Sequence, residues 1–269
     1  MKIVILGYTG LVGNDILQYL AKNTSYKIVC IGRNTFSKPY RNPRIKYFKW
    51  NFKSFTKSNL FFIKNSNVVI NCVGKIQNTD DNLKEINEIF IKNLVSYLNN
   101  LKLEIRLIHL SSVSVYGGAK EYLGIKKSIF ETSPIRAHNL YSKSKINADL
   151  YIKKNINYKN NNKLSYSILR ITNIFGGKKE SNLFKFVIFS LKIGFWIRCY
   201  ENTIFNFINV KDVTQSIILI LSKLKKSKNK IYILYNDLYQ KQLYKNYQNL
   251  YKKKIIKFKL PFIFIKFLV

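Results

Sequence analysis

Lys2-Ile-Val-Ile-Leu-Gly7-Tyr-Thr-Gly10-Leu-Val-Gly13 starts as a short apolar, β-branched run and ends in three glycines spaced three residues apart. Residues 14–21 then repeat apolar side chains at helical spacing. A strand, a glycine turn and a helix in this order direct the first backbone N–H groups of the helix toward an anion. The stretch therefore predicts a dinucleotide-binding turn. The predicted pyrophosphate contacts are Gly7, Gly10, Leu11, Val12 and Gly13.

Strand and helix patterns continue to alternate after this turn. Apolar strand patterns occur at 26–31, 44–50, 67–73, 106–110 and 164–171. Helical patterns lie between most of them, and those at 55–63 and 80–99 predict helices. Such alternation predicts an α/β protein with a doubly wound parallel sheet, the Rossmann architecture. We expect residues 1–177 to form the NAD(P)-binding core and residues 178–269 a small C-terminal substrate lobe. Within the second region, residues 205–235 are predicted to return to the core sheet.

The end of the second predicted strand bears on the choice of cofactor. In dinucleotide folds an acidic side chain at this position binds the hydroxyls of the adenosine ribose. Here Gly32 occupies the position and Arg33 follows. A cation without a carboxylate suits a 2′-phosphate, so NADP is modestly favoured over NAD. The alternative is that Arg33 is one more surface cation of a basic protein. Val73 and Gly74, after the strand at 67–73, are further predicted cofactor contacts.

Composition limits the classes of function. The chain has 269 residues and a formal net charge of +34. Lysines are scattered along it, whereas nucleic-acid-binding proteins concentrate charge on one face and use Arg at base edges. We therefore expect no nucleic-acid partner. A lysine-driven binder of nucleic acid or membrane is the competing hypothesis, and it predicts steep salt dependence.

Cysteine, histidine and apolar runs point to a cytoplasmic protein. Cys30, Cys72 and Cys199 lie far apart in apolar runs, which is typical of reduced, buried thiols. The chain has only two histidines, so no metal cluster of His and Cys at ligand spacing is expected. His109 is interpreted as a packed core residue. No uncharged run reaches the ~18 residues that span a bilayer, so no transmembrane segment is expected. Peripheral contact with a membrane surface and a homodimer both stay open.

Tyr141 and Lys145 are the candidate catalytic pair. They are four residues apart in a predicted helix, so their side chains project from one face. A tyrosine at its reference pKa near ~10 is a poor base at neutral pH. We expect the Lys145 ammonium, together with an oxidised nicotinamide ring, to lower the pKa of Tyr141. Ser112, at the end of the preceding strand, can hydrogen-bond the substrate oxygen that exchanges its proton with Tyr141.

Three motifs together resemble those of the extended short-chain dehydrogenase/reductase family, which includes nucleotide-sugar epimerases, dehydratases and reductases. They are GxxGxxG at Gly7, SSxxVYG from Ser111 to Gly117 and YxxxK at Tyr141. Leu169-Arg170 with Asn173 and Gly176, and the segment from Phe207 to Val213, also resemble family motifs, so the resemblance covers residues 1 to about 215 in the family's order and spacing. It implies that Ser112 orients the substrate, Tyr141 is the acid/base and Lys145 holds the nicotinamide ribose. It also implies that Asn173 contacts the phosphates of the sugar nucleotide and that Asn51 contacts adenine.

Two departures from the family pattern narrow the expected reaction. The 4,6-dehydratases of this family resemble one another in an Asp-Glu pair where Val113-Ser114 stand here, so elimination of water lacks its acid and base. Many epimerases of the family have a phosphate-binding Arg where Phe205 stands. We therefore expect an NAD(P)-dependent epimerase or keto-reductase that moves a hydride at a ring carbon of a nucleotide-activated sugar. The resemblance implies a role in surface-polysaccharide biosynthesis. The alternative is a non-catalytic NAD(P)-binding module with a structural or redox-sensing role.

Overall fold

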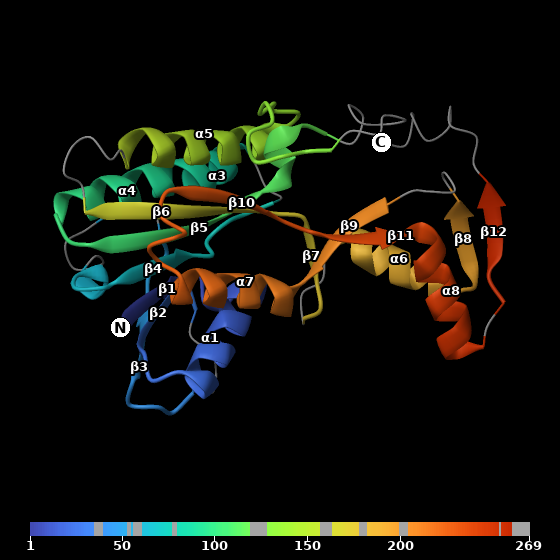
Figure 1. The fold of residues 1–269 in the computed structure, drawn as a ribbon, viewed down its shortest axis with the longest axis horizontal. Coiled ribbons are helices and arrows are strands. Elements are labelled where there is room, and N and C mark those ends of the chain that lie inside the picture. The colour runs from blue at the N-terminus through green and yellow to red at the C-terminus, as the bar shows by residue number, and fades with distance from the viewer. Residues whose placement is uncertain are drawn as a thin grey trace.

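The computed structural model describes residues 1–34, 40–52, 55, 61–76, 80–118, 128–156, 163–177, 182–198, 204–252 and 254–259. A seven-stranded parallel sheet forms its centre, in the order β10-β6-β5-β4-β1-β2-β3 (Figure 1). This confirms the predicted doubly wound sheet. The strands are β1 (Lys2–Leu6), β2 (Lys27–Gly32), β3 (Ile45–Lys49), β4 (Val68–Asn71), β5 (Ile105–Ser112), β6 (Leu164–Ile171) and β10 (Lys230–Leu234).

Helices cover both faces of the sheet (Figure 1). On one face lie α1 (Leu11–Asn23) and α7 (Val210–Ser222), and on the other α3 (Asp80–Lys84), α4 (Phe90–Asn100) and α5 (Leu140–Asn155). Every residue of β4 and β6 is buried, as expected for strands enclosed on both faces.

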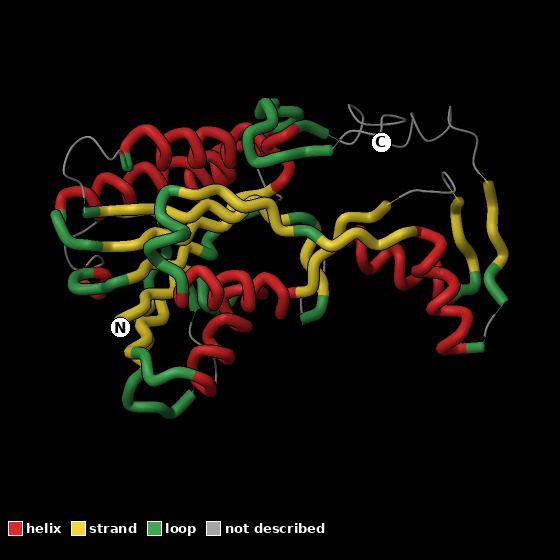
Figure 2. Tube along the Cα trace, in the orientation of Figure 1, coloured by secondary structure: helices red, strands yellow, loops and turns green. Residues whose placement is uncertain are grey.

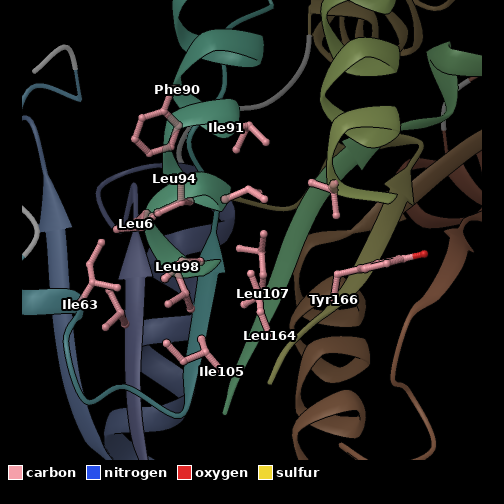
Figure 3. Packing of buried hydrophobic residues seen from close by; sticks show 14 of the residues in the cluster. Leu6, Ile63, Phe90, Ile91, Leu94, Leu98, Ile105, Leu107, Leu164 and Tyr166 are labelled. Carbon is pink, nitrogen blue, oxygen red and sulfur yellow. The ribbon is translucent and has the colours of Figure 1, made fainter. Parts of the chain in front are cut away.

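The apolar stripe of α4 forms much of one core. Figure 3 shows Phe90, Leu94 and Leu98 of α4 beside Leu6 and Leu107 of the sheet, and all five belong to one buried cluster. Each fully buried side chain of this kind contributes roughly 1.5–3 kcal/mol relative to an exposed one. This packing holds the helices rigidly over the sheet, so the loops at its edge start from fixed positions.

The order of the strands reverses between β1 and β4. From β1 the chain builds outward to β2 and β3, and then returns to the other side of β1 as β4. Loops after two such strands diverge to opposite faces, and ligands of open α/β sheets bind at this point. Gly7 follows β1 and residues 72–74 follow β4. The predicted glycine turn and the predicted Val73–Gly74 contacts thus lie at the same switch point.

A second region extends beyond the carboxyl edge of the sheet (Figure 2). It contains a three-stranded sheet and a pair of parallel strands, with a core of its own around Trp196, Phe207 and Tyr244. Its elements are β7 (Asn173–Phe175), α6 (Asn182–Lys192), β8 (Phe195–Arg198), β9 (Ile204–Asn209), β11 (Asn236–Tyr239), α8 (Gln240–Tyr251) and β12 (Ile256–Lys259).

The segment 205–235 divides between the two regions. β10 pairs with β6 in the central sheet, whereas β9 pairs with β7 and β11 of the three-stranded sheet. Residues 205–209 therefore do not return to the core sheet as predicted. The reason is that Phe207, only 1% exposed, packs into the core of the second region. The domain boundary at residue 177 stays a prediction.

Two helical predictions need comment. Residues 80–100 are helical as expected, but a π-helical turn, η2 (Glu85–Ile89), interrupts the α-helix. The helix predicted at 55–63 lies largely outside the described residues, and Phe61–Ile63 forms a 3₁₀ turn. Cys199 also lies outside them. Within the described ranges, none of the helices combines the length and apolarity that a membrane crossing requires.

Candidate active site

The glycine turn packs tightly against its surroundings. Gly7 has φ 78°, and a Cβ there would lie 3.1 Å from the backbone of Cys72 and Val73. A Cβ on Gly13 would lie 2.5 Å from the Gly7 carbonyl oxygen, so α1 can start this close to the turn only without a side chain at that position. Gly10 is the N-cap of α1. The first N–H groups of the helix, on Leu11, Val12 and Gly13, therefore lack partners within the helix, and donors of this kind favour an anion at a helix N-terminus.

The loop after β4 is held against α5 by Asn87, which sits in the π-helical turn. Its side-chain amide accepts from the Lys75 N–H at 2.9 Å and donates to the Lys75 carbonyl at 2.9 Å. The same amide donates to Ser144 Oγ at 3.1 Å, between the two residues of the candidate pair. Asn87 is 1% exposed. A fully bonded buried amide of this kind ties the Val73–Gly74 loop to the helix that carries Tyr141 and Lys145.

Lys145 points from α5 toward this loop. Its Nζ donates to the Leu110 carbonyl at 3.1 Å, and a Cβ on Gly74 would lie 3.2 Å from that Nζ. Burial lowers the pKa of Lys145 to about 8, while Asp149 and Cys72 oppose the decrease. Burying a charged ammonium costs free energy of folding, so keeping Lys145 beside the loop destabilises the folded protein unless other groups compensate for the lost hydration.

Tyr141 and Ser112 meet at the carboxyl end of β5. They share a hydrogen bond. The Ser112 oxygen also accepts from the Ser114 N–H at 3.2 Å and caps η3 (Val113–Tyr116), which leaves its own proton for Tyr141 or for a substrate oxygen. α5 starts with a capping box between Asn139 and Ser142, which fixes the turn that presents Tyr141.

Among the groups of the protein itself, the pKa of Tyr141 is raised, whereas the predicted decrease also counted the charge of an oxidised nicotinamide ring. Burial raises it, the hydrogen bond from Ser112 lowers it and the charge on Asp149 raises it. Desolvation, which depends on tertiary packing, disfavours the phenolate. Lys145 instead directs its ammonium to the Leu110 carbonyl.

The ring of Tyr8 explains why a glycine, Gly32, stands at the end of β2. A Cβ on Gly32 would lie 2.9 Å from the ring of Tyr8, which is fully buried, and the Tyr8 hydroxyl donates to the Asn34 carbonyl at 3.4 Å. A carboxylate side chain at position 32 would therefore collide with Tyr8. Arg33 and Asn51 are both exposed near this strand end. Their predicted contacts with the cofactor stay predictions.

Asn173 begins β7, just after the end of β6, and is exposed. The following loop returns to the glycine turn, since a Cβ on Gly177 would collide with the Leu11 side chain. The second region thus starts beside the N-terminus of α1. The role of Asn173 toward a substrate stays a prediction.

The model of the NAD dependent epimerase/dehydratase family matches residues 3–234. The chain belongs to this family. The match spans the central sheet, both candidate catalytic elements and β9 to β10. Among curated proteins, no sequence matches the chain.

Solved structures share the fold of this epimerase/dehydratase family member. UDP-glucuronic acid 4-epimerase from Bacillus cereus, in complex with NAD, has a TM-score of 0.77 at 17% identity, covering 97% of this chain and 87% of that one. UDP-Glc/GlcNAc 4-epimerase from Campylobacter jejuni has a TM-score of 0.76 at 16% identity, covering 97% and 86%. dTDP-glucose 4,6-dehydratase from Bacillus anthracis, in complex with NAD, has a TM-score of 0.74 at 18% identity, covering 97% and 85%.

A dinucleotide fits the residues of this family member. The glycines at the switch point leave a cradle that a Cβ would fill, and α1 offers its first N–H groups to a pyrophosphate. These residues fit any nicotinamide dinucleotide. The choice between NAD and NADP depends on the residues near the adenosine ribose, at the end of β2.

The sequence analysis missed two residues of this site, Asn87 and Asp149. Asp149 could have been found, because Tyr141, Lys145 and Asp149 follow one another at intervals of four along α5. Asn87 had no such signal. Its helical pattern predicts a regular α-helix, and the π-helical turn that aims its side chain depends on packing against α5.

Proposed function

We propose that the protein is an NAD(P)-dependent enzyme that oxidises and reduces one ring carbon of a nucleotide-activated sugar, as an epimerase or a keto-reductase. The observation that carries the proposal is the Tyr141–Ser112 hydrogen bond beside a buried Lys145 that faces the Gly74 loop. These groups come from α5, β5 and the switch point, where the family binds its dinucleotide.

Each residue of the proposed trio has a distinct task. Tyr141 takes the hydroxyl proton of the sugar as the ring carbon is oxidised, and returns it to the oxygen on reduction. Ser112 hydrogen-bonds the same oxygen and keeps it in line with Tyr141. Lys145 holds the nicotinamide ribose. Bound NAD(P) supplies the hydride acceptor and donor.

The residues after Ser112 favour epimerisation or reduction over dehydration. Elimination of water needs an acid and a base beside the ring, and Val113 and Ser114 offer neither. An epimerase must retain its cofactor and let the oxidised sugar turn, so that hydride returns to its other face. A keto-reductase consumes one cofactor per product. Net cofactor consumption therefore separates the two.

The proposed substrate is a UDP-sugar, in line with the solved structures of shared fold that bind UDP-glucose or UDP-glucuronic acid. In this proposal the second region, starting at Asn173, holds the nucleotide. A role in surface-polysaccharide synthesis stays an expectation.

The test is a panel of UDP- and dTDP-sugars incubated with the purified full chain and NAD or NADP. Product stereochemistry is followed by NMR, and net cofactor turnover by nicotinamide absorbance. We expect one UDP-sugar to give its epimer without net turnover, or one keto-sugar to be reduced with stoichiometric turnover. If the protein binds the cofactor but converts no sugar of the panel, the non-catalytic binding module becomes the better hypothesis.

The proposed preference for NADP predicts the effect of Arg33→Ala. Arg33 is exposed at the end of β2, where a 2′-phosphate would extend from the adenosine ribose. We expect the variant to lose about tenfold in NADP affinity and little in NAD affinity, since a hydrogen bond to a charged group contributes about 1.5–3 kcal/mol when well formed. Fluorescence titration with both reduced cofactors measures this.

Lys27→Ala is the matched control for Arg33→Ala. It removes an exposed cation from the opposite end of β2 and should leave both affinities unchanged. Equal affinity of the unaltered protein for the two cofactors would refute the argument from Arg33, while the fold assignment would stand.

A further inference from the structure

Lys145 has a buried acidic neighbour on its own helix. Asp149 follows it by four residues on α5, and the two side chains are 4% and 0% exposed. Asp149 Oδ2 accepts from Arg170 Nε at 3.0 Å, whereas Oδ1 has no hydrogen-bond partner among the described residues. A buried carboxyl group with one free oxygen therefore lies one turn behind the ammonium of the candidate site.

The side chains around Asp149 are placed by further contacts. Arg170 Nη1 donates to the Tyr116 hydroxyl at 2.6 Å and to the Glu131 carbonyl at 3.3 Å, which fixes the guanidinium across the carboxyl group. His109 Nε2 lies 3.9 Å from Asp149 Oδ1. The buried Ser111 hydroxyl, at the carboxyl end of β5, has no hydrogen-bond partner among the described residues.

The tautomer of His109 follows from its other contact. The Val73 N–H donates to Asn71 Oδ1 at 3.1 Å, so the oxygen of the Asn71 amide is turned toward Val73. The amide nitrogen then faces His109 Nδ1 at 3.0 Å, and as an N–H donor it requires Nδ1 to accept. Burial lowers the pKa of His109 well below its usual value, so the ring is neutral. Its single proton is therefore on Nε2, the atom that faces Asp149.

Arg170 Nε thus donates to Asp149, and His109 turns its Nε2–H toward Oδ1 at 3.9 Å, too far for a hydrogen bond. Donors favour the ionised carboxylate over the acid. Burial raises the pKa of Asp149, and the Arg170 and Lys145 cations oppose the rise.

We propose that the Asp149 carboxylate is a positioning residue that keeps Lys145 protonated, and that Asn71, His109 and Arg170 hold Asp149 in the ionised state this requires. The inference deepens the proposed function, on which the task of Lys145 rests. The contacts also link the cofactor loop to the charge of Lys145, because the Val73 N–H sets the orientation of Asn71 and hence the tautomer of His109.

The other groups that face Lys145 do not supply a charge. Cys72, after β4, has its thiol pKa raised to about 12 by burial, so it is neutral. His109 of β5 is neutral, and burial raises the pKa of Tyr141. On the adjoining η2, Glu88 is paired with Lys92 at 2.6 Å. Asp149 is thus the nearby carboxylate that favours the protonated form of Lys145.

The test follows the titration of Lys145 directly, by NMR of isotope-labelled lysine side chains in the full chain. No sugar is needed, so the result does not depend on the proposed reaction. Lys145→Arg identifies the signal by removing it. We expect Lys145 to titrate near pH 8 in the unaltered protein. In Asp149→Asn, which keeps the size of the side chain, the midpoint should be about one pH unit or more lower.

The direction of the shift separates a charge effect from a structural one. Loosened packing would admit water and move the Lys145 midpoint upward, toward that of an ordinary lysine. An unchanged or raised midpoint in Asp149→Asn would overturn the proposal. Glu88→Gln is the matched control, since it removes a buried carboxylate that contacts Lys92 and Asn147, and should leave the midpoint unchanged.

A second measurement covers the case in which Asp149→Asn does not fold. The protonation of Asp149 in the unaltered protein is read from the NMR shifts of isotope-labelled aspartate carboxyl groups. An ionised Asp149 at neutral pH is expected, and a protonated one would refute the proposal. Failure of either NMR test leaves the sugar-panel result untouched, so the two proposals fail separately.

Discussion

Turnover in Tyr141→Phe is expected to fall by about 10²–10⁴-fold, the usual contribution of a general acid–base group. The substitution removes one oxygen and keeps the ring, so the packing of α5 is preserved. What is lost is the proton carrier that shares a hydrogen bond with Ser112. Binding of NAD(P), measured by fluorescence titration, should stay within about twofold, while steady-state kinetics on the substrate found in the sugar panel measure the rate.

Tyr151→Phe is the control for this prediction. Tyr151 lies on the same helix, and its hydroxyl contacts Ser96 Oγ at 3.0 Å on the α4 side, remote from the switch point. The same chemical change there should leave turnover near normal. Near-normal turnover in Tyr141→Phe itself would show that another residue moves the proton.

Lys145→Met is expected to weaken cofactor binding and turnover together. Met fills a similar volume, so the buried site keeps its packing while the ammonium is lost. A charged hydrogen bond is worth about 1.5–3 kcal/mol, which corresponds to about 10–100-fold in NAD(P) affinity. Turnover should fall at least as much, because Lys145 is proposed to hold the nicotinamide ribose in place.

The pH dependence of cofactor affinity tests the same prediction. The pKa of Lys145 is about 8, so the ammonium is present below that pH and lost above it. Cofactor affinity in the unaltered protein should therefore decline as pH rises through about 8. In Lys145→Met this decline should vanish, whereas the control Lys143→Met, an exposed position on the same helix, should retain it. The same decline in both variants would assign it to another group.

Much of the fold could be predicted because its signals are local. The period of apolar residues separates strand from helix within a few turns of chain, and the glycines after β1 mark a turn whose geometry few other residues allow. Strand–helix alternation then leaves the doubly wound parallel sheet as the consistent arrangement. The prediction failed at residues 205–209, where the strand pattern is real but its partner strand is not encoded locally.

Part of the candidate site also came from local spacing. Tyr141 and Lys145 share a helix face because they are four residues apart, and Ser112 lies at the end of a predicted strand. By contrast, the sequence linked the glycine at position 32 to the choice of cofactor. The structure shows a steric reason for this glycine, because a side chain there would collide with the buried ring of Tyr8. That contact joins two strand ends and has no signature in either segment.

The amino-acid sequence by itself determined the strand and helix segments, the glycine turn and the residues that α5 presents together. Only the tertiary structure decided the electrostatics, namely the raised pKa of Tyr141, the lowered pKa of Lys145 and the tautomer of His109. The physical reason is that periodicity is a property of neighbouring residues. Desolvation and hydrogen-bond direction depend instead on groups that β4, β5, β6 and α5 bring together from distant parts of the chain.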